Sequence, residues 1–513
     1  MTDEQSQGLA DLLGVSFLAY VLSLSEGEIA ARLKGTKTLD PDGEDALADV
    51  LAHAAELGSD RPFGITPALP DGSSLVRMRR FGWTDLDRDH THANLFRLAT
   101  GGVLPEVPDG MSAAETAIAE AAIEYYPITL LSLEQGKAFL PPKPLISRKH
   151  VRALEAALAN DPIKRLFAPG TVFYTSSGMG YGALMTYRVA ECALATAEQR
   201  VRMLTNKSPA SFISEATDNL RRMRELVESG SCAVPTVVGF WNVEMPADVA
   251  LAGPRRGLLR PARDSDPHVP MAARATVALD TTCEVGLHVG AKPPPAGSRF
   301  WTGVERLVVD EQLVSLAALL AGPGADGELA LPVLAWTQVF DPFQPYVGRF
   351  LPAPSGPPTV PFPAERLAEL EQWIGRLDCG YHPSIRVAIS RTLSAVTERG
   401  LSDDALIDYV IALENLFGGP GPKLEIRISN ALAAVLGKDR EQEADIAERS
   451  RCVYRARSKL VHGDELPEMD QHLQDQAQLL LLDALRVLFT THTKLLADRK
   501  ARRQLGTKRP GVG

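Results

Sequence analysis

The sequence predicts a mainly α-helical protein with a mixed α/β central region and an all-α helical bundle in its C-terminal part. The chain has 513 residues, 45% of them hydrophobic and 23% charged, which is typical of globular proteins with several domains. Between residues 61 and 350, segments with strand character alternate with helical patterns. Beyond a proline-rich run at 351–363, only helical patterns remain, with apolar residues three and four positions apart.

Residues 1–60 are predicted to form a small helical unit. The stretch from Val15 to Gly35 resembles the helix-turn-helix of Xre-type antitoxins and repressors, with Ser23-Leu24-Ser25 as its turn. A helix that reads DNA needs a basic rim, yet residues 1–58 contain 3 Lys+Arg against 11 Asp+Glu. Internal packing or contact with another protein is therefore favoured over DNA binding.

Residues 61–350 are predicted to form a mixed α/β region with a sensor or regulatory role. Helical patterns cover residues 112–135, 148–160 and most of 183–230. Strands are predicted at Thr171–Tyr174, Ala233–Val243, Ala272–Val289, Arg306–Val309 and Leu331–Phe340.

The run Leu351–Pro363 contains six prolines in thirteen residues and is predicted to be a linker, because proline interrupts helices and central strands. Residues 364–495 follow as the bundle, and residues 496–513 as a frayed basic tail. The predicted helices of the bundle are Ala364–Leu377, Pro383–Glu398, Asp403–Phe417, Leu424–Leu436, Arg440–Val461 and Asp470–Thr493.

The stretch from Tyr454 to Gly463 combines arginine with histidine at helical spacing. Arg455 and His462 are seven positions apart, or ~700° around a helix, so they share one face. Arg457 is offset from His462 by ~140°, and Ser458 lies one turn before His462. Either arginine is a candidate partner for the histidine.

These residue types suit RNA cleavage, because RNA carries its own nucleophile in the 2′-hydroxyl group. Histidine can act as acid or base near neutral pH, and arginine grips phosphate and stays charged. One histidine does not easily serve both proton transfers, which favours a dimer with two such helices. The alternative is structural: arginine and histidine also stabilise the carbonyl end of a helix.

Three blocks in a fixed order add context to this motif. They are Ala412-Leu413-Glu414-Asn415-Leu416-Phe417, then Leu424-Glu425-Ile426-Arg427 with Ala431 to Gly437, and then Tyr454-x-x-Arg457-Ser458-Lys459-Leu460-Val461-His462-Gly463. Residues 402–463 thereby resemble the Apea-like HEPN family of prokaryotic helical domains.

The resemblance implies a bundle that dimerises with its motif helices facing, and, in active members, a metal-independent endoribonuclease. Arg457 and His462 would be the catalytic pair of its R-x4-6-H motif. Glu414 and Arg427 would lie near them, to orient the histidine or to bind phosphate. Many active members have Asn, Asp or His after the arginine, where this chain has Ser458, as is usual in the Apea-like branch.

The resemblance also implies a role: a regulated effector of phage defence or stress response that cuts tRNA or mRNA. The alternative is a non-catalytic HEPN module that serves dimerisation or interaction in a regulatory protein. The two differ in whether His462→Ala abolishes growth toxicity while leaving the dimer intact.

Two other motifs carry weaker signals. His90-Thr91-His92 lies between acidic residues, but no further ligand follows at a diagnostic spacing, so a polar loop is favoured over a metal site. The run from Gly178 to Gly182 follows a strand but lacks the spacing and the lysine of a phosphate-binding loop, which favours a tight turn.

Composition sets the remaining expectations. The five cysteines form no C-x-x-C pair, and no apolar run reaches the ~18 residues of a membrane helix. The net charge of −10 is carried entirely by residues 1–363, since residues 364–513 contain 22 basic and 22 acidic side chains. We expect a cytoplasmic protein without cofactor, metal or membrane partner.

Overall fold

The computed structural model describes most of the chain beyond residue 105. The described residues are 106–134, 146, 148–178, 180–204, 208–251, 257–263, 266, 274–323, 329–344, 348–350, 360–377, 383–399, 403–419, 422–462 and 471–507. The predicted unit at 1–60, the segment His90-Thr91-His92 and Gly463 lie outside them. Helices predominate among the described residues, which confirms the predicted mainly α fold.

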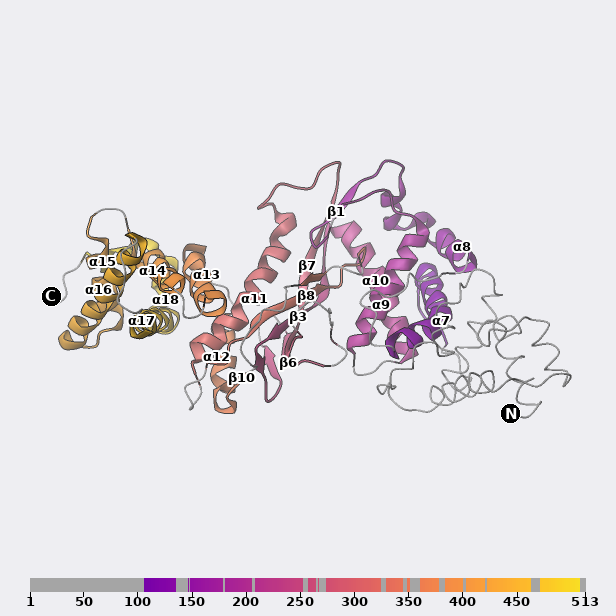
Figure 1. Ribbon diagram of the computed structural model, residues 1–513. Helices are drawn as coiled ribbons and strands as arrows, with labels where there is room; N and C mark the ends of the chain where they lie inside the picture. The colour runs from indigo at the N-terminus through magenta and orange to yellow at the C-terminus, as the bar shows by residue number, and fades with distance from the viewer. Residues whose placement is uncertain are drawn as a thin grey trace, which may run out of the picture.

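A group of helices covers one face of a central sheet (Figure 1). The group consists of α7 (Ala113–Glu134), α8 (Arg148–Ala157), α9 (Thr186–Met203) and α10 (Pro209–Ser229). The hydroxyl of Ser208 accepts a hydrogen bond from the amide of Ser211 and begins α10, and Gly230 ends it with φ of 77°. The predicted helical stretch 183–230 is thus two helices, because Ser208 and Pro209 start a new one.

A reciprocal capping box begins α7. The amide of Ser112 donates to Glu115 Oε2 at 2.7 Å, and the amide of Glu115 donates to Ser112 Oγ at 3.4 Å. Arg221 of α10 donates to the other carboxylate oxygen of Glu115 at 2.6 Å. Glu115 therefore both starts α7 and holds it to α10.

This arrangement makes the stability of the helical group depend on pH. Burial raises the pKa of Glu115, but hydrogen bonds from Ser112 and the guanidinium of Arg221 outweigh burial and lower it from 4.5 to about 2. A depressed carboxyl pKa stabilises the fold above the unfolded value, and the contribution disappears as pH falls from 4.5 towards 2.

We expect Glu115→Gln to lower the free energy of unfolding by about 2–3 kcal/mol at pH 7 and by much less at pH 3. Urea unfolding at both pH values, followed by circular dichroism, measures the difference. The control is Glu155→Gln, which changes an exposed carboxyl group of α8. Equal pH dependence of the two variants would contradict the assignment.

The central sheet is antiparallel and is built around three strands: β3 (Ser231–Trp241), β7 (Val277–Val289) and β8 (Val333–Val339). The strand order is β2-β1-β7-β3-β8-β9, with β6 paired to β7 and β5 paired to β6. The shorter strands are β1 (Phe173–Thr175), β2 (Gly180–Tyr181), β5 (Val249–Leu251), β6 (Gly257–Pro261) and β9 (Gly348–Phe350). Four of the five predicted strand segments thus contain strands of this sheet.

The fifth prediction, a strand at Arg306–Val309, is wrong. These residues lie inside α11 (Thr302–Ala321), whose buried side chains continue from Leu307 through Ala321. The two adjacent β-branched valines favour a strand locally, but the apolar pattern over the following turns has helical spacing. Four residues are therefore too few to distinguish the two-residue repeat of a strand from the ~3.6-residue repeat of a helix.

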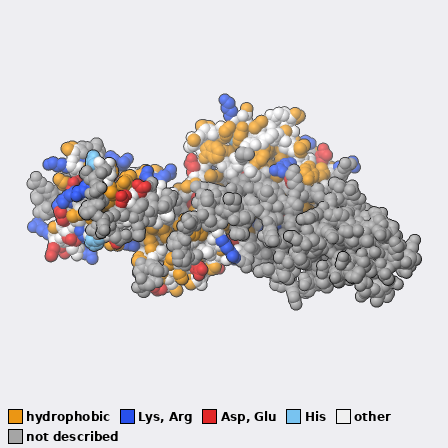
Figure 2. Space-filling view, in the orientation of Figure 1, with side chains coloured by type: hydrophobic (Ala, Val, Ile, Leu, Met, Phe, Trp, Pro, Cys, Tyr) orange, Lys and Arg blue, Asp and Glu red, His pale blue; other side chains and the backbone are white. Residues whose placement is uncertain are grey.

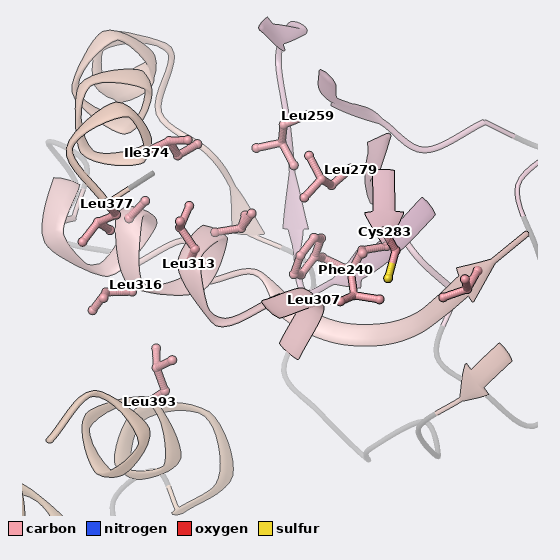
Figure 3. Packing of buried hydrophobic residues seen from close by; sticks show 14 of the residues in the cluster. Phe240, Leu259, Leu279, Cys283, Leu307, Leu313, Leu316, Ile374, Leu377 and Leu393 are labelled. Atoms are coloured by element: carbon pink, nitrogen blue, oxygen red, sulfur yellow. The ribbon is translucent and has the colours of Figure 1, made fainter. Parts of the chain in front are cut away.

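Helix α11 joins the sheet to the C-terminal bundle through one continuous hydrophobic core. Figure 3 shows Leu307 of α11 near Phe240 of the sheet, and Leu316 with Leu377 on one side and Leu393 on the other. These last two residues belong to α12 (Leu367–Leu377) and α13 (Arg386–Ser394). Arg486 of α17 donates from Nε to the Leu320 carbonyl at 3.0 Å, so it also holds the end of α11.

The last residues of the predicted linker are packed against the rest of the protein. Val360–Pro361 forms β10, which pairs in parallel with β4 (Val243–Glu244), and Phe362 is buried. Residues 351–359 lie outside the described part of the chain. Helix α12, which the sequence assigned to the bundle, packs along α11 and against β5 because its apolar face completes the core on that side.

The bundle contains five of the six helices that the sequence assigned to it. They are α13, α14 (Asp403–Phe417), α15 (Leu424–Leu436), α16 (Arg440–His462) and α17 (Gln471–Thr490). The bounds of α14 and α15 match the prediction, since acidic starts and the Gly/Pro break between them mark the ends clearly. Acidic and basic side chains are mixed over the visible face of the bundle (Figure 2).

The basic segment after residue 495 was predicted to be a frayed tail, and in its described part it is folded. Residues Thr493–Ala497 form α18 and Arg499–Leu505 form α19, which packs against α14 and α15. Arg502 is fully buried, and its guanidinium donates to the carbonyls of Leu416, Leu495 and Leu496. An arginine that reaches otherwise unpaired helix-end carbonyls is an anchor that polarity alone does not predict.

Candidate active site on helix α16

Helix α16 carries most of the predicted site residues. Its start is capped by Asp439, whose carboxylate accepts from the amide of Gln442 at 2.9 Å. The buried face of α16 contains Ile446, Ser450 and Val453, which are spaced four and three residues apart. The next position at this spacing is Arg457. Arg457 therefore occupies a position on the buried face of α16 where an apolar side chain would be expected.

Tyr454 and Glu414 are brought together by α16 and α14. The Tyr454 hydroxyl donates to Glu414 Oε1 at 2.5 Å. Burial raises the pKa of Tyr454, and the carboxylate of Glu414 raises it further, so the hydroxyl stays a hydrogen-bond donor at neutral pH. The contact fixes one face of α16 against the end of α14.

Arg457 lies one turn beyond Tyr454 and is half-buried. Its Nε atom is shielded from solvent and has no hydrogen-bond partner among the described residues. Its positive charge acts on the Tyr454 hydroxyl against the effect of Glu414. Arg457 forms no ion pair with a described carboxylate, so its positive charge suits it to an anionic ligand.

Arg455 is placed differently. Its side chain is 56% exposed, and its guanidinium lies 3.4 Å from Glu425 of α15 and 3.6 Å from Glu448 of α16. The two carboxylates largely neutralise the arginine. The structure therefore separates the two candidate arginines: Arg455 belongs to an exposed ion-pair group, and Arg457 does not.

His462 is the last residue of α16 and is exposed. It makes no hydrogen bond or ion pair with the described residues, so the structure does not bring it into contact with Arg457. Ser458, one turn before it, is half-buried. Both His462 and Arg455 are exposed, as the predicted shared face requires.

Arg427 is at the start of α15 and donates from Nη2 to the Gly419 carbonyl at 2.6 Å. It therefore holds the turn between α14 and α15, just beyond Glu414. Arg503 of α19 donates to the neighbouring Gly418 carbonyl at 2.7 Å. Sequence reasoning missed Arg503 and the acidic partners of Arg455, because these contacts join helices far apart in the chain.

In the glycine-rich run from Gly178 to Gly182, Gly180–Tyr181 form strand β2 and Gly178 lies in the connection from β1. Strands β1 and β2 pair here as a hairpin, in the register Phe173 to Tyr181. A Cβ atom at Gly180 would lie 2.3 Å from the Tyr174 ring, so glycine is needed for close packing. The run serves the hairpin.

Among the described residues, no three His, Cys, Asp or Glu side chains lie together in an arrangement suited to a metal ion. None of the described helices combines the length and apolar character needed to cross a membrane. Comparisons of the chain with known protein families, with curated proteins and with solved structures find no match.

Proposed function

We propose that the protein is a metal-independent endoribonuclease of the HEPN type, with Arg457 and His462 as its catalytic pair. The observation that carries the proposal is the state of Arg457: a half-buried arginine beside the Tyr454–Glu414 hydrogen bond, with no ion pair to a carboxylate among the described residues. Since the comparisons match no family, the proposal rests on the motif residues and their placement.

The chemistry follows from the two side chains. His462 removes the proton from a ribose 2′-hydroxyl or protonates the leaving oxygen, and the products carry 2′,3′-cyclic phosphate ends. Arg457 stabilises the negative charge that develops on the phosphorus-bound oxygens. Tyr454 and Glu414 hold the helix face that presents Arg457.

A homodimer through the bundle is part of the proposal. Arg457 and His462 differ by ~140° around α16, so one copy does not point both side chains at one phosphate. A second α16 facing the first would bring two histidines to one substrate. Val461 of α16 and Ile426 of α15 are exposed apolar side chains, at 51% and 42%, that a contact between two bundles would cover.

We also propose that the protein is an effector whose remaining regions restrain or trigger cleavage of tRNA or mRNA in phage defence or stress response. The continuous core through α11 supports such coupling, because changes in the sheet region reach the bundle through packed side chains.

The test uses full-length protein with total tRNA and a structured mRNA fragment, in EDTA. Wild type is compared with His462→Ala and with the control His492→Ala, which changes a histidine after α17. We expect fragments with 2′,3′-cyclic phosphate ends from wild type and the control only. Equal cleavage by His462→Ala would overturn the site, and RNA binding without cleavage by any protein would favour the non-catalytic module.

A further inference from the structure

Helix α19 presents a set of cationic side chains that the proposed chemistry does not use. Arg499 and Lys500 are exposed and make no ion pair with a described acidic residue. Arg503 is half-buried and lies one turn after Arg499 on the same side of the helix. The carboxylate of Asp498 is occupied as the cap of α19, where it accepts from the amide of Ala501 at 2.8 Å.

The buried Arg502 adds positive charge beneath this surface. Its described hydrogen bonds all go to neutral oxygens: the carbonyls of Leu416, Leu495 and Leu496 and the hydroxyl of Ser384. Burial, together with the charges of the neighbouring Arg499 and Arg503, lowers the pKa of Arg502 to about 10, against the opposing effect of Asp498. Arg499, Arg502 and Arg503 thus lie close together, and the buried Arg502 makes no hydrogen bond to a carboxylate among the described residues.

The surface extends to the turn between α14 and α15. A Cβ atom at Gly419 would lie 3.4 Å from Arg503 Cδ and 3.6 Å from Arg427 Nη1, so both arginines flank this glycine. A Cβ atom at Gly506 would lie 2.3 Å from the Arg427 carbonyl oxygen, so glycine permits α19 to approach α15. The α19 cationic face therefore comprises Arg427, Arg499, Lys500 and Arg503.

This face is physically continuous with the proposed active site. Arg503 donates to the Gly418 carbonyl, and the amide of Gly418 donates to the Glu414 carbonyl at 2.8 Å. Glu414 in turn accepts from Tyr454, one turn before Arg457. Glu414 and Gly418 are four helical residues apart, a rise of only ~6 Å, so these contacts place α19 on the side of the bundle where Tyr454 and Glu414 meet.

We infer that the α19 cationic face binds the phosphate backbone of single-stranded RNA beside the cleavage site. The inference rests on the proposed function, because RNA is the polyanion that this site would process. Exposed arginine and lysine on a rigid helix provide contacts that do not depend on sequence and that place the backbone. An acidic membrane surface would meet the same charges and is treated as a competing outcome.

The test measures binding separately from cleavage. The host protein is full-length His462→Ala, and the probe is a fluorescein-labelled single-stranded RNA titrated by fluorescence anisotropy at several KCl concentrations. The test variant adds Arg499→Gln and Lys500→Gln. The matched control adds Lys438→Gln and Arg440→Gln. These two exposed cations lie at the start of α16, the end of the helix opposite Arg457. Circular dichroism verifies that both variants fold.

We expect the test variant to reduce the slope of log Kobs against log salt by about 1.4, or ~0.7 for each lost phosphate contact, and the control to leave it unchanged. Equal slopes and affinities for the test and control variants overturn the inference. So does loss of binding to phosphatidylserine vesicles without loss of RNA binding. If wild type cleaves no RNA but the slope falls as expected, the ribonuclease proposal fails and the binding face stands.

Discussion

Arg457→Ala is expected to lower the rate of RNA cleavage by about 10²–10³-fold, and Arg455→Ala by less than about tenfold. The difference follows from their partners. Arg455 lies between Glu425 and Glu448, so much of its charge is already compensated. Arg457 has no ion pair among the described residues, so its charge remains available for phosphate.

Single-turnover cleavage of one defined RNA, with enzyme in excess, measures both variants directly. Arg457→Lys is the third arm: it retains the charge but loses the forked donors, so its rate should lie between those of wild type and Arg457→Ala. A larger loss for Arg455→Ala than for Arg457→Ala would show that the arginine sharing a face with His462 contacts the phosphate.

Arg502→Ala is expected to destabilise the bundle by about 3–5 kcal/mol, the second large effect. The substitution removes the donor to the carbonyls of Leu416 and Leu495 and leaves the carbonyl of Leu496 with only the hydroxyl of Ser384, and each unsatisfied buried acceptor costs about 1–3 kcal/mol. The removed side chain also leaves a cavity, because Arg502 is fully buried.

Hydrogen exchange and urea unfolding measure this effect at two levels. We expect faster exchange over α18 and α19 and a lower urea midpoint. The matched control is Lys500→Ala in the same helix, which changes an exposed side chain and should cost less than about 0.5 kcal/mol. Equal stability of the two variants would mean that α19 is not anchored by Arg502.

The helices of the bundle were predictable because their signals are local. Gly418 to Pro422 separates α14 from α15, and apolar residues recur at helical spacing on both sides. The strand predicted at Arg306–Val309 failed because two adjacent valines look the same in a short strand and in a buried helix.

The candidate site also has a part that the sequence indicated and a part that only the contacts between helices revealed. The motif blocks drew attention to Tyr454 and Glu414 one by one, and the hydrogen bond between them became evident only in the structure. The motif did not separate Arg455 from Arg457, because the acids that neutralise Arg455 come partly from another helix. The role of the basic segment was also hidden, since Arg502 is recognisable as an anchor only beside the carbonyls it reaches.

The sequence by itself determined where α14 and α15 begin and end, and it is the source of the proposal that Arg457 and His462 carry phosphate and acid–base chemistry. Caps, breakers and apolar periodicity act over one or two turns, and such information is local. Only the tertiary structure decided that α12 belongs with α11, that α19 folds against α14 and α15, and that Arg457 forms no ion pair with a described carboxylate. These outcomes depend on which partners meet in space, and burial and pairing set the state of a charge.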